Sequence, residues 1–272
     1  MHKIFIIVGA GIICIAEVLL FSKVRPVAIF FTPIVWTGYI LLIDGVIYSI
    51  RKESLIISRT KEFFLMLFLS LIFWIIFEFY NLYIENWFYI NLIRSKPLLI
   101  FGCSWAWMTI MPGLFETAEL LESLKFLDVK IKRFNISKIF VNILLICGFF
   151  LLLLPLFVPK TYAKWLAIPV WTGFIFFCDP INYKFGGKSL LGDFEGGRAG
   201  KFLSLFVGGL ICGFLWEFWN HWAYTKWIYG FPYWTYPKLF EMPLLGYLGF
   251  PALALEYYTM YNSTKLLLNT ER

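Results

Sequence analysis

The sequence predicts an all-α polytopic membrane protein with about eight transmembrane helices. Of its 272 residues, 60% are hydrophobic and only 15% are charged, and the mean hydropathy is +0.76. A water-soluble domain cannot hide so large an apolar fraction, so lipid is the expected solvent. A second observation is a series of apolar runs of about 18 residues or more, the length that crosses a bilayer as a helix. A third is an internal duplication.

Eight apolar runs are expected to be membrane spans, and no separate water-soluble domain is expected. The runs cover residues 4–21, 27–50, 62–83, 98–121, 139–158, 164–183, 202–222 and 243–262. The second and sixth runs each contain an acidic residue, which weakens their hydropathy signal.

The basic residues predict the orientation of the spans. With eight spans, both termini and the loops after the second, fourth and sixth spans share one side. That side holds 16 of the 24 Lys and Arg residues. The positive-inside rule therefore places both termini in the cytoplasm, with the chain in the cell (inner or plasma) membrane. The net charge of +7 then reflects topology and contact with anionic lipid headgroups, so no nucleic-acid partner is expected.

The duplication divides the chain into two membrane repeats of four spans, residues 1–134 and 135–272. The segments that recur in order are WTGYILLID (36–44) as WTGFIFFCD (171–179), EFYN (78–81) as EFWN (217–220), and Trp87 and Tyr89 as Trp227 and Tyr229. The offset drifts slowly, from 135 to 140 residues, as small loop insertions would produce. Because four spans separate equivalent points, the two repeats are expected to be parallel in the membrane.

Polar residues gather at the end of the seventh predicted span, in WEFWNHWAY. One stripe of this helix is expected to carry Gly209, Gly213, Glu217 and His221, with Asn220 and Tyr224 beside it. The two glycines allow a neighbouring helix or a ligand to approach the backbone closely. The first repeat has Ser70, Trp74, Glu78 and Leu82 at the corresponding positions, with Asn81 after the acid. One working centre biased towards the second repeat is therefore expected.

Other acidic residues fall within the predicted spans, where an ionised carboxylate costs a few kcal/mol at least. They are Glu17, Asp44, Glu116, Glu119, Asp179 and Glu256. Several have structural interpretations as well. Asp44 and Asp179 precede basic turns and could pair with Arg51 or Lys184. Glu116 and Glu119 are expected near the inner boundary, within reach of water. The acid–amide pairs in the third and seventh spans could be interhelical packing contacts.

Aromatic residues make up 21% of the chain. Part of this fraction fits an interfacial belt in the outer loops. However, Trp74, Trp105, Trp107, Trp171 and Trp216 fall within spans, where a belt does not reach. An aromatic interior suits a long unsaturated or cyclic apolar ligand, and its ring faces could stabilise a carbocation.

The residue inventory excludes several classes of enzyme. Two histidines are too few for a membrane di-iron oxygenase, and there is no thiol cluster for zinc or iron–sulfur. No convincing serine–histidine–acid set is present. The remaining chemistry is proton transfer by carboxylic acids, with no metal and no cofactor, or no chemistry at all. The sequence makes no prediction of oligomeric state.

One pattern in the sequence is an acid, then Trp-x-Tyr, then a span that is led by a Pro and contains an acid. In this pattern the sequence resembles the membrane-integral lycopene cyclase domains of bacteria and fungi. The residues that carry the resemblance are Glu78, Trp87, Tyr89, Pro112 and Glu116, and then Glu217, Trp227, Tyr229, Pro251 and Glu256. They cover roughly half of the chain. The family's Pro-x-Glu-Glu motif is absent and each half has one extra span, so a shared fold is expected before a shared substrate.

The resemblance implies redox-neutral cyclisation of an isoprenoid, in which a neutral acid protonates a carbon–carbon double bond and a second group removes a proton. Glu217 is the expected acid, with Glu256 and Glu78 as partners and with Asn220 and His221 orienting or reprotonating it. The expected substrate-binding residues are Asn81, Trp216, Trp171, Tyr224, Asp44, Asp179 and Glu116. The alternative is a proton-coupled transporter or lipid-binding membrane protein, which the same parallel repeats and acids would fit. A purely structural subunit is the third hypothesis.

Overall fold

The computed structural model describes residues 1–268, and 74% of the chain is helical. In chain order the elements are α1 (His2–Phe21), α2 (Arg25–Ile29), α3 (Phe31–Arg51), α4 (Leu55–Ser58), α5 (Thr60–Ile84), β1 (Trp87–Ile90), α6 (Lys96–Met108), α7 (Ile110–Ser123), α8 (Lys138–Phe157), α9 (Lys160–Ala163), α10 (Ala167–Lys184), α11 (Leu190–Glu195), α12 (Gly200–Trp222), β2 (Lys226–Tyr229), β3 (Lys238–Leu239), β4 (Met242–Pro243), the 3-10 helix η1 (Leu244–Leu248) and α13 (Gly249–Leu267). The short strands are an addition to the all-α prediction.

Six helices in the described part of the chain are long and apolar enough to cross a membrane. They are His2–Phe21, Phe31–Arg51, Thr60–Ile84, Lys96–Ser123, Lys138–Phe157 and Gly200–Trp222. The fourth combines α6 and α7. The chain is therefore an α-helical membrane protein, as its composition predicts.

The two other predicted spans correspond to α10 and α13, which are less apolar helices of 18 and 19 residues. The last one begins at Gly249, later than predicted, because residues 244–248 form η1. Nearly every residue of α13 from Phe250 to Asn262 is buried, because the helix packs against α10 and α12. A helix enclosed by other helices can carry polar side chains without exposing them to lipid.

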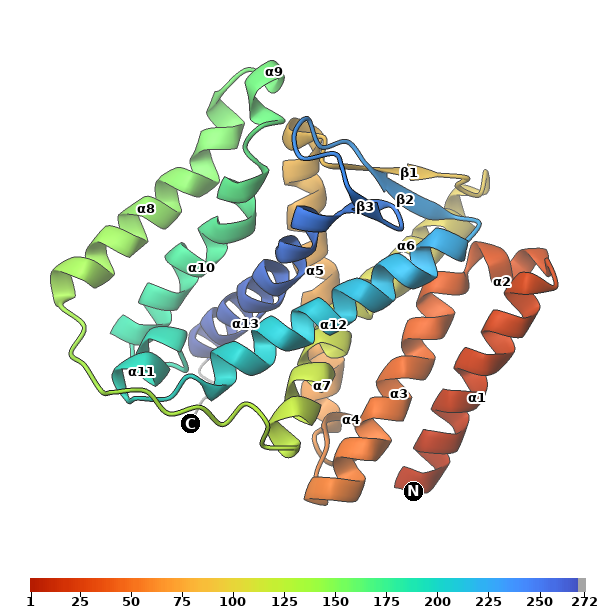
Figure 1. Ribbon diagram of the computed structural model, residues 1–272, viewed down its shortest axis with the longest axis horizontal. Coiled ribbons are helices and arrows are strands. Elements are labelled where there is room, and N and C mark those ends of the chain that lie inside the picture. The colour runs from red at the N-terminus through yellow and green to blue at the C-terminus, as the bar shows by residue number, and fades with distance from the viewer. Residues whose placement is uncertain (269–272) are drawn as a thin grey trace.

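Helix pairs that are far apart in the sequence form the two edges of the bundle (Figure 1). α1 packs against α3 at one edge, and α8 packs against α10 at the opposite edge. α12 and α13 lie between them, and residues 124–137 run along one end of the bundle to join the two halves of the chain. Trp36, Phe77 and Tyr257 are among the largest fully buried side chains of the shared core.

The fourth predicted span bends between α6 and α7. Pro112 has no N–H to donate to the carbonyl of Met108, and its ring would clash with that carbonyl in a straight helix. Ser70 on α5 bonds the groups that the bend exposes. Its Oγ donates to the Trp107 carbonyl at 2.6 Å and accepts from the Met111 N–H at 3.0 Å. A bend within the membrane is tolerated because a neighbouring helix supplies these partners.

The glycines of α12 bring α13 close, which confirms the expectation that a neighbouring helix could approach there. A Cβ atom on Gly209 would lie 2.7 Å from the Phe250 carbonyl oxygen and from the Pro251 Cα. A Cβ on Gly213 would collide with the ring of Phe250. The start of α13 therefore lies directly against the backbone of α12.

β1 and β2 join the two halves of the chain in an antiparallel ribbon at the end of the bundle opposite residues 124–137 (Figure 1). The register pairs Trp87 with Tyr229, Phe88 with Ile228, and Tyr89 with Trp227. Each Trp of one strand therefore lies opposite the Tyr of the other.

Candidate functional site

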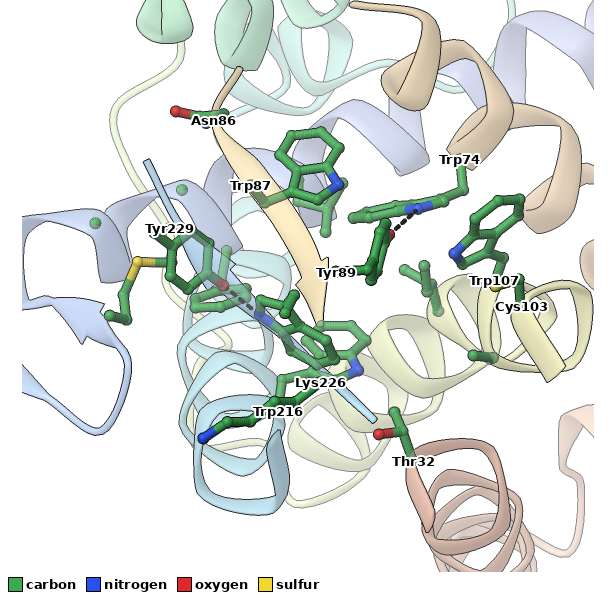
Figure 2. A pocket seen from close by; sticks show the side chains of 18 of the residues that line it. Thr32, Trp74, Asn86, Trp87, Tyr89, Cys103, Trp107, Trp216, Lys226 and Tyr229 are labelled. Carbon is green, nitrogen blue, oxygen red and sulfur yellow. Dashed lines mark hydrogen bonds between the residues drawn. The ribbon is translucent and has the colours of Figure 1, made fainter. Parts of the chain in front are cut away.

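A cavity of about 540 Å³ lies at this end of the bundle, lined by the β1–β2 ribbon, the start of α3, parts of α5, α6, α10, α12 and α13, and the segment after β2. Its aromatic lining comes from both halves of the chain and includes Trp74, Trp87, Tyr89, Trp107, Trp171, Trp216, Trp227 and Tyr229. Figure 2 shows Trp74, Trp107 and Tyr89 gathered on one side and Tyr229 on the other. Of the five tryptophans predicted within spans, four line the cavity, whereas Trp105 does not and donates to the Thr37 hydroxyl at 3.0 Å.

Two asparagines hold the ribbon over the cavity by the same hydrogen bonds. The Asn81 side chain donates to the Trp87 carbonyl at 2.8 Å and accepts from the Trp87 N–H at 3.2 Å. The Asn220 side chain donates to the Trp227 carbonyl at 2.9 Å and accepts from the Trp227 N–H at 3.0 Å. These bonds go to the strands and not to a neighbouring helix. The asparagines therefore position the ribbon, and Asn220 does not orient the Glu217 carboxyl group as expected.

Glu78 lies behind the wall of the cavity on the first-half side. Its Oε1 accepts hydrogen bonds from Trp74 Nε1 at 2.8 Å, from Trp87 Nε1 at 3.1 Å and from the Tyr89 hydroxyl at 2.5 Å. The side chain is partly exposed. Three donors on one oxygen hold this carboxyl group in one orientation.

Glu217 occupies the corresponding place on the second-half side and is fully buried. Its Oε1 accepts from the Tyr229 hydroxyl at 2.7 Å and from Trp227 Nε1 at 3.2 Å. The same indole N–H also lies 2.7 Å from the Tyr229 oxygen. Glu217 Oε2 is buried and has no hydrogen-bond partner among the described residues. One half of this carboxyl group is thus sealed away from both water and protein donors.

The groups that reach the cavity are therefore the tyrosine hydroxyls, with the glutamates behind them. Tyr89 and Tyr229 line the cavity, whereas Glu78 and Glu217 do not. Burial raises the pKa of Tyr229 well above its ordinary value and does the same for Tyr89. Both phenols therefore stay protonated at neutral pH. The repeated Trp-x-Tyr motif was the signal for these residues, which the predicted site did not include.

His221 points away from Glu217. Its Nδ1 lies 3.4 Å from Glu241 Oε1, in the turn between β3 and β4, and Lys226 Nζ donates to the same oxygen at 2.8 Å. Partial burial acts to raise the pKa of Glu241, but the hydrogen bond and charge of Lys226 outweigh it and lower this pKa. Tyr224 is exposed and does not line the cavity. Neither His221 nor Tyr224 therefore has the place that the helical stripe predicted.

Trp171 and Trp216 do line the cavity, as their prediction as substrate-binding residues requires. Trp171 stacks on Phe77 with a centroid distance of 5.3 Å. Trp216 stacks on Phe250 at 5.9 Å and packs against Trp36 at 4.4 Å. These contacts fix both indoles in the wall.

Asp44 and Asp179 hold the short helices α4 and α11, far from the cavity lining. Asp44 accepts from the Ser54 hydroxyl at 3.0 Å and from the Ile56 N–H at 2.6 Å. Asp179 accepts from the N–H groups of Leu190 at 2.8 Å and Leu191 at 2.9 Å. A carboxylate is favourable at a helix N-terminus, where N–H groups lack partners. Both residues therefore have a structural role that fits neither substrate binding nor pairing with a basic residue.

The basic residues that were expected to pair with Asp44 and Asp179 have other partners. Arg51 lies 3.5 Å from Glu119, and Lys184 donates to Asn142 at 3.0 Å. Glu116 is fully buried beside Asp44, so the expectation that water reaches it is wrong. Glu116 does not line the cavity either.

Glu256 is fully buried on α13, and neither of its carboxyl oxygens has a hydrogen-bonding side chain among the described residues. It does not line the cavity. The predicted acids thus fall into two groups: Glu78 and Glu217 adjoin the cavity, and Glu256, Glu116, Asp44 and Asp179 do not.

Comparison of the chain with protein-family models, with curated proteins and with solved structures found no match. The functional hypothesis therefore depends on the geometry of the site.

Proposed function

We propose that this membrane protein binds an apolar, isoprenoid-class molecule in the aromatic cavity and catalyses a redox-neutral proton transfer on it, as a cyclase or isomerase does. One observation carries the proposal. Two tyrosine hydroxyls on the wall of a single cavity each donate a hydrogen bond to a glutamate, and the two glutamates come from different halves of the chain. Paired acid and base groups facing one space are what this chemistry requires.

The cavity wall supports a neutral apolar ligand. Among the described residues that line it, Lys226 alone carries a charge, and Glu241 neutralises that charge. The volume falls within the range of about 300–1,000 Å³ that is common for small-molecule sites. Several apolar lining residues, such as Leu98, Ile168 and Leu248, are exposed. We infer that an apolar ligand enters from the bilayer past these side chains.

The two tyrosine–glutamate pairs have complementary roles in this proposal. Glu217 is the acid: when the Tyr229 hydroxyl turns towards the ligand and gives its own proton to the double bond, its oxygen accepts the proton carried by Glu217 Oε1. The double bond that takes the proton leaves a carbocation, which the faces of Trp171 and Trp216 stabilise. Ring closure onto a second double bond moves the positive charge, and loss of a proton towards Tyr89 and Glu78 restores neutrality. One proton enters the ligand and one leaves it, so no oxidant or reductant is needed. After the product leaves, Glu78 releases its proton and Glu217 regains one through Tyr229, which restores both groups.

We also propose eight spans in two parallel repeats, with α10 and α13 as the sixth and eighth spans and both termini in the cytoplasm. A two-fold axis along the membrane normal would make equivalent strands antiparallel and exchange their partners. The pairing of Trp87 with Tyr229 and of Tyr89 with Trp227 has this exchange symmetry. The matching asparagine bonds support the same relation, and so does the resemblance to membrane-integral lycopene cyclases.

The test is a reconstituted assay with a linear polyene such as lycopene in deuterated water. The proposal predicts a product with the elemental composition of the substrate that carries deuterium, and Glu217→Gln should abolish its formation. If Glu217→Gln forms product at the wild-type rate, Glu217 is not the acid. The transporter hypothesis predicts unchanged polyene and an accumulation that follows a pH gradient across proteoliposomes.

A further inference from the structure

Residues 124–137, which join α7 to α8, form a basic surface at the end of the bundle opposite the cavity (Figure 1). The segment contains four basic residues, Lys125, Lys130, Lys132 and Arg133, and one acidic residue, Asp128. All four basic residues are exposed. None of their side chains has an ion pair or a hydrogen bond within residues 1–268. The described part of the chain therefore leaves this positive charge without a partner.

The same segment exposes apolar side chains between the basic ones. Phe126 is 77% exposed and Phe134 is 49% exposed, and Val129 and Ile131 are exposed as well. Contact of apolar side chains with water is unfavourable. Basic and aromatic residues that alternate on one surface are typical of a membrane interface, where rings lie among the lipids and cations meet the phosphates. The composition of the segment therefore fits lipid better than water.

Backbone contacts with the residues before α12 hold the segment in place. The Ile131 N–H donates to the Gly197 carbonyl at 3.0 Å, and the Ile136 N–H donates to Glu195 Oε1 at 3.0 Å. A Cβ atom on Gly197 would lie 2.8 Å from the Ile131 carbonyl oxygen, so the two backbones are in direct contact. Because the segment is already ordered, little conformational entropy is lost when it binds a partner.

Both ends of the segment join helices that can cross a membrane. α7 completes the apolar helix Lys96–Ser123, and α8 is the apolar helix Lys138–Phe157. Ile139 and Phe140, at the start of α8, are 72% and 48% exposed, as expected of side chains that face lipid. A short connection between two spans that end on the same side lies at the membrane surface. The basic residues are therefore within reach of lipid headgroups.

The basic residues of α3 and of the α4–α5 connection, at the same end of the bundle, differ in having carboxylate partners. Arg51 lies 3.5 Å from Glu119 and 3.9 Å from Glu122. Arg59 lies 2.6 Å from Glu119 and 3.6 Å from Glu62. Unpaired positive charge is thus concentrated in residues 124–137, and it does not simply follow the number of basic residues near the spans.

We propose that residues 124–137 bind anionic phospholipid at the membrane surface. The four basic side chains contact the phosphate groups, and Phe126 and Phe134 insert beside them. Basic residues next to a span attract anionic lipid in this way. The surface lies at the opposite end of the bundle from the cavity, so the proposed function does not depend on it.

The test is a competition between two lipids that differ only in the headgroup. The full chain in detergent is incubated with equal amounts of phosphatidylglycerol and phosphatidylcholine that have the same acyl chains, and native mass spectrometry gives the ratio bound. Wild type should retain phosphatidylglycerol in excess. Lys130→Gln/Lys132→Gln should reduce that excess about tenfold or more, because each basic residue at the surface contributes a preference of roughly fivefold. Arg94→Gln/Lys96→Gln, which removes two exposed charges at the opposite end of the bundle, should change it less than about twofold.

Phe126→Ser tests the apolar part of the surface. It should weaken the retention of both lipids by a similar factor, because the ring contacts acyl chains that the two lipids share. Equal retention of the two lipids by wild type would overturn the proposal, and so would equal losses in the two double variants. If Lys130→Gln/Lys132→Gln keeps its lipid and loses an acidic protein that copurifies with wild type, the surface binds a protein and the proposal is wrong.

Discussion

Glu78 and Glu217, the two glutamates next to the cavity, accept hydrogen bonds from corresponding donors but differ in burial. Glu78 and Glu217 each accept from a Trp indole and a Tyr hydroxyl of the adjoining strand. Glu78 has a third donor, Trp74, and is partly exposed. Glu217 is fully buried and has a bare oxygen.

One helix position also differs between the two sites. Gly213 occupies the place that corresponds to Trp74, and the ring of Phe250 fills the space where a side chain would stand. The second half thus exchanges a hydrogen-bond donor for close packing of α12 against α13. The common donors hold each carboxyl group, and the two groups differ in exposure: Glu217 is sealed, whereas Glu78 is partly exposed. A sealed group suits the storage of a proton, and an open one suits its exchange.

The largest expected effect is a difference in product formation between variants of the two glutamates. Glu217→Gln should reduce product formation by about a hundredfold or more, because general acid catalysis contributes roughly 10²–10⁴-fold. Glu78→Gln should reduce it less, because water can also take up a proton on the exposed side. Product is measured by mass spectrometry after reconstitution. Equal losses in the two variants would remove the distinction between acid and base.

Close packing of α12 gives the next effect, on stability. Gly209→Ala should destabilise the fold by about 1–3 kcal/mol, because the added methyl group would meet the backbone of Phe250 and Pro251, which cannot rotate away. Gly11→Ala, where a Cβ meets nothing within 4 Å, is the matched control. Unfolding by denaturing detergent measures both. A Gly209→Ala protein as stable as the control would contradict the packing described for the second half.

Removal of each tyrosine hydroxyl tests the donor sets. Tyr229→Phe leaves Glu217 with Trp227 alone and should destabilise by about 1–3 kcal/mol, the cost of an unsatisfied buried group. Tyr89→Phe leaves Glu78 with two indole donors and access to water, so about 1 kcal/mol or less is expected. The same unfolding assay applies. A larger loss in Tyr89→Phe would reverse the comparison.

The smallest expected effect concerns the ion pair between Lys226 of β2 and Glu241, in the second half of the chain. Lys226 holds the pKa of Glu241 below the ordinary 4.5 in spite of partial burial, so the unfolded chain binds this proton more readily. The resulting stabilisation, about 0.5–1 kcal/mol, is complete above pH about 4.5 and is lost as pH falls through the lower, folded-state pKa. Glu241→Gln should remove this part of the pH dependence. The segment after β1 in the first half, residues 91–95, contains no acid. If the stability of Glu241→Gln depends on pH in the same way as that of wild type, the Lys226–Glu241 ion pair does not stabilise the fold.

The sequence predicted the helical membrane architecture well, because apolar length and composition are local properties. It also predicted the close approach at Gly209 and the inward place of Trp171 and Trp216. It did not predict Tyr89 and Tyr229 as the groups at the wall, because their position depends on strand pairing between residues about 140 apart.

Helix periodicity also has limits near a helix end. It placed His221 on the stripe of Glu217, but α12 ends at Trp222, so His221 lies in the last turn of the helix and meets the β3–β4 turn. Asp44 and Asp179 were expected to pair with charged side chains. Their partners are mainly backbone N–H groups of short helices, which no pattern of side chains reveals.

The most direct test of the central claim is mass spectrometry of the molecules that copurify with wild type and with Glu217→Gln after gentle extraction from the source membrane. An isoprenoid-class species in both samples, shifted in the variant towards an uncyclised precursor, is the predicted result. Ordinary phospholipid alone in both samples would contradict the account and would direct attention to transport driven by a pH gradient.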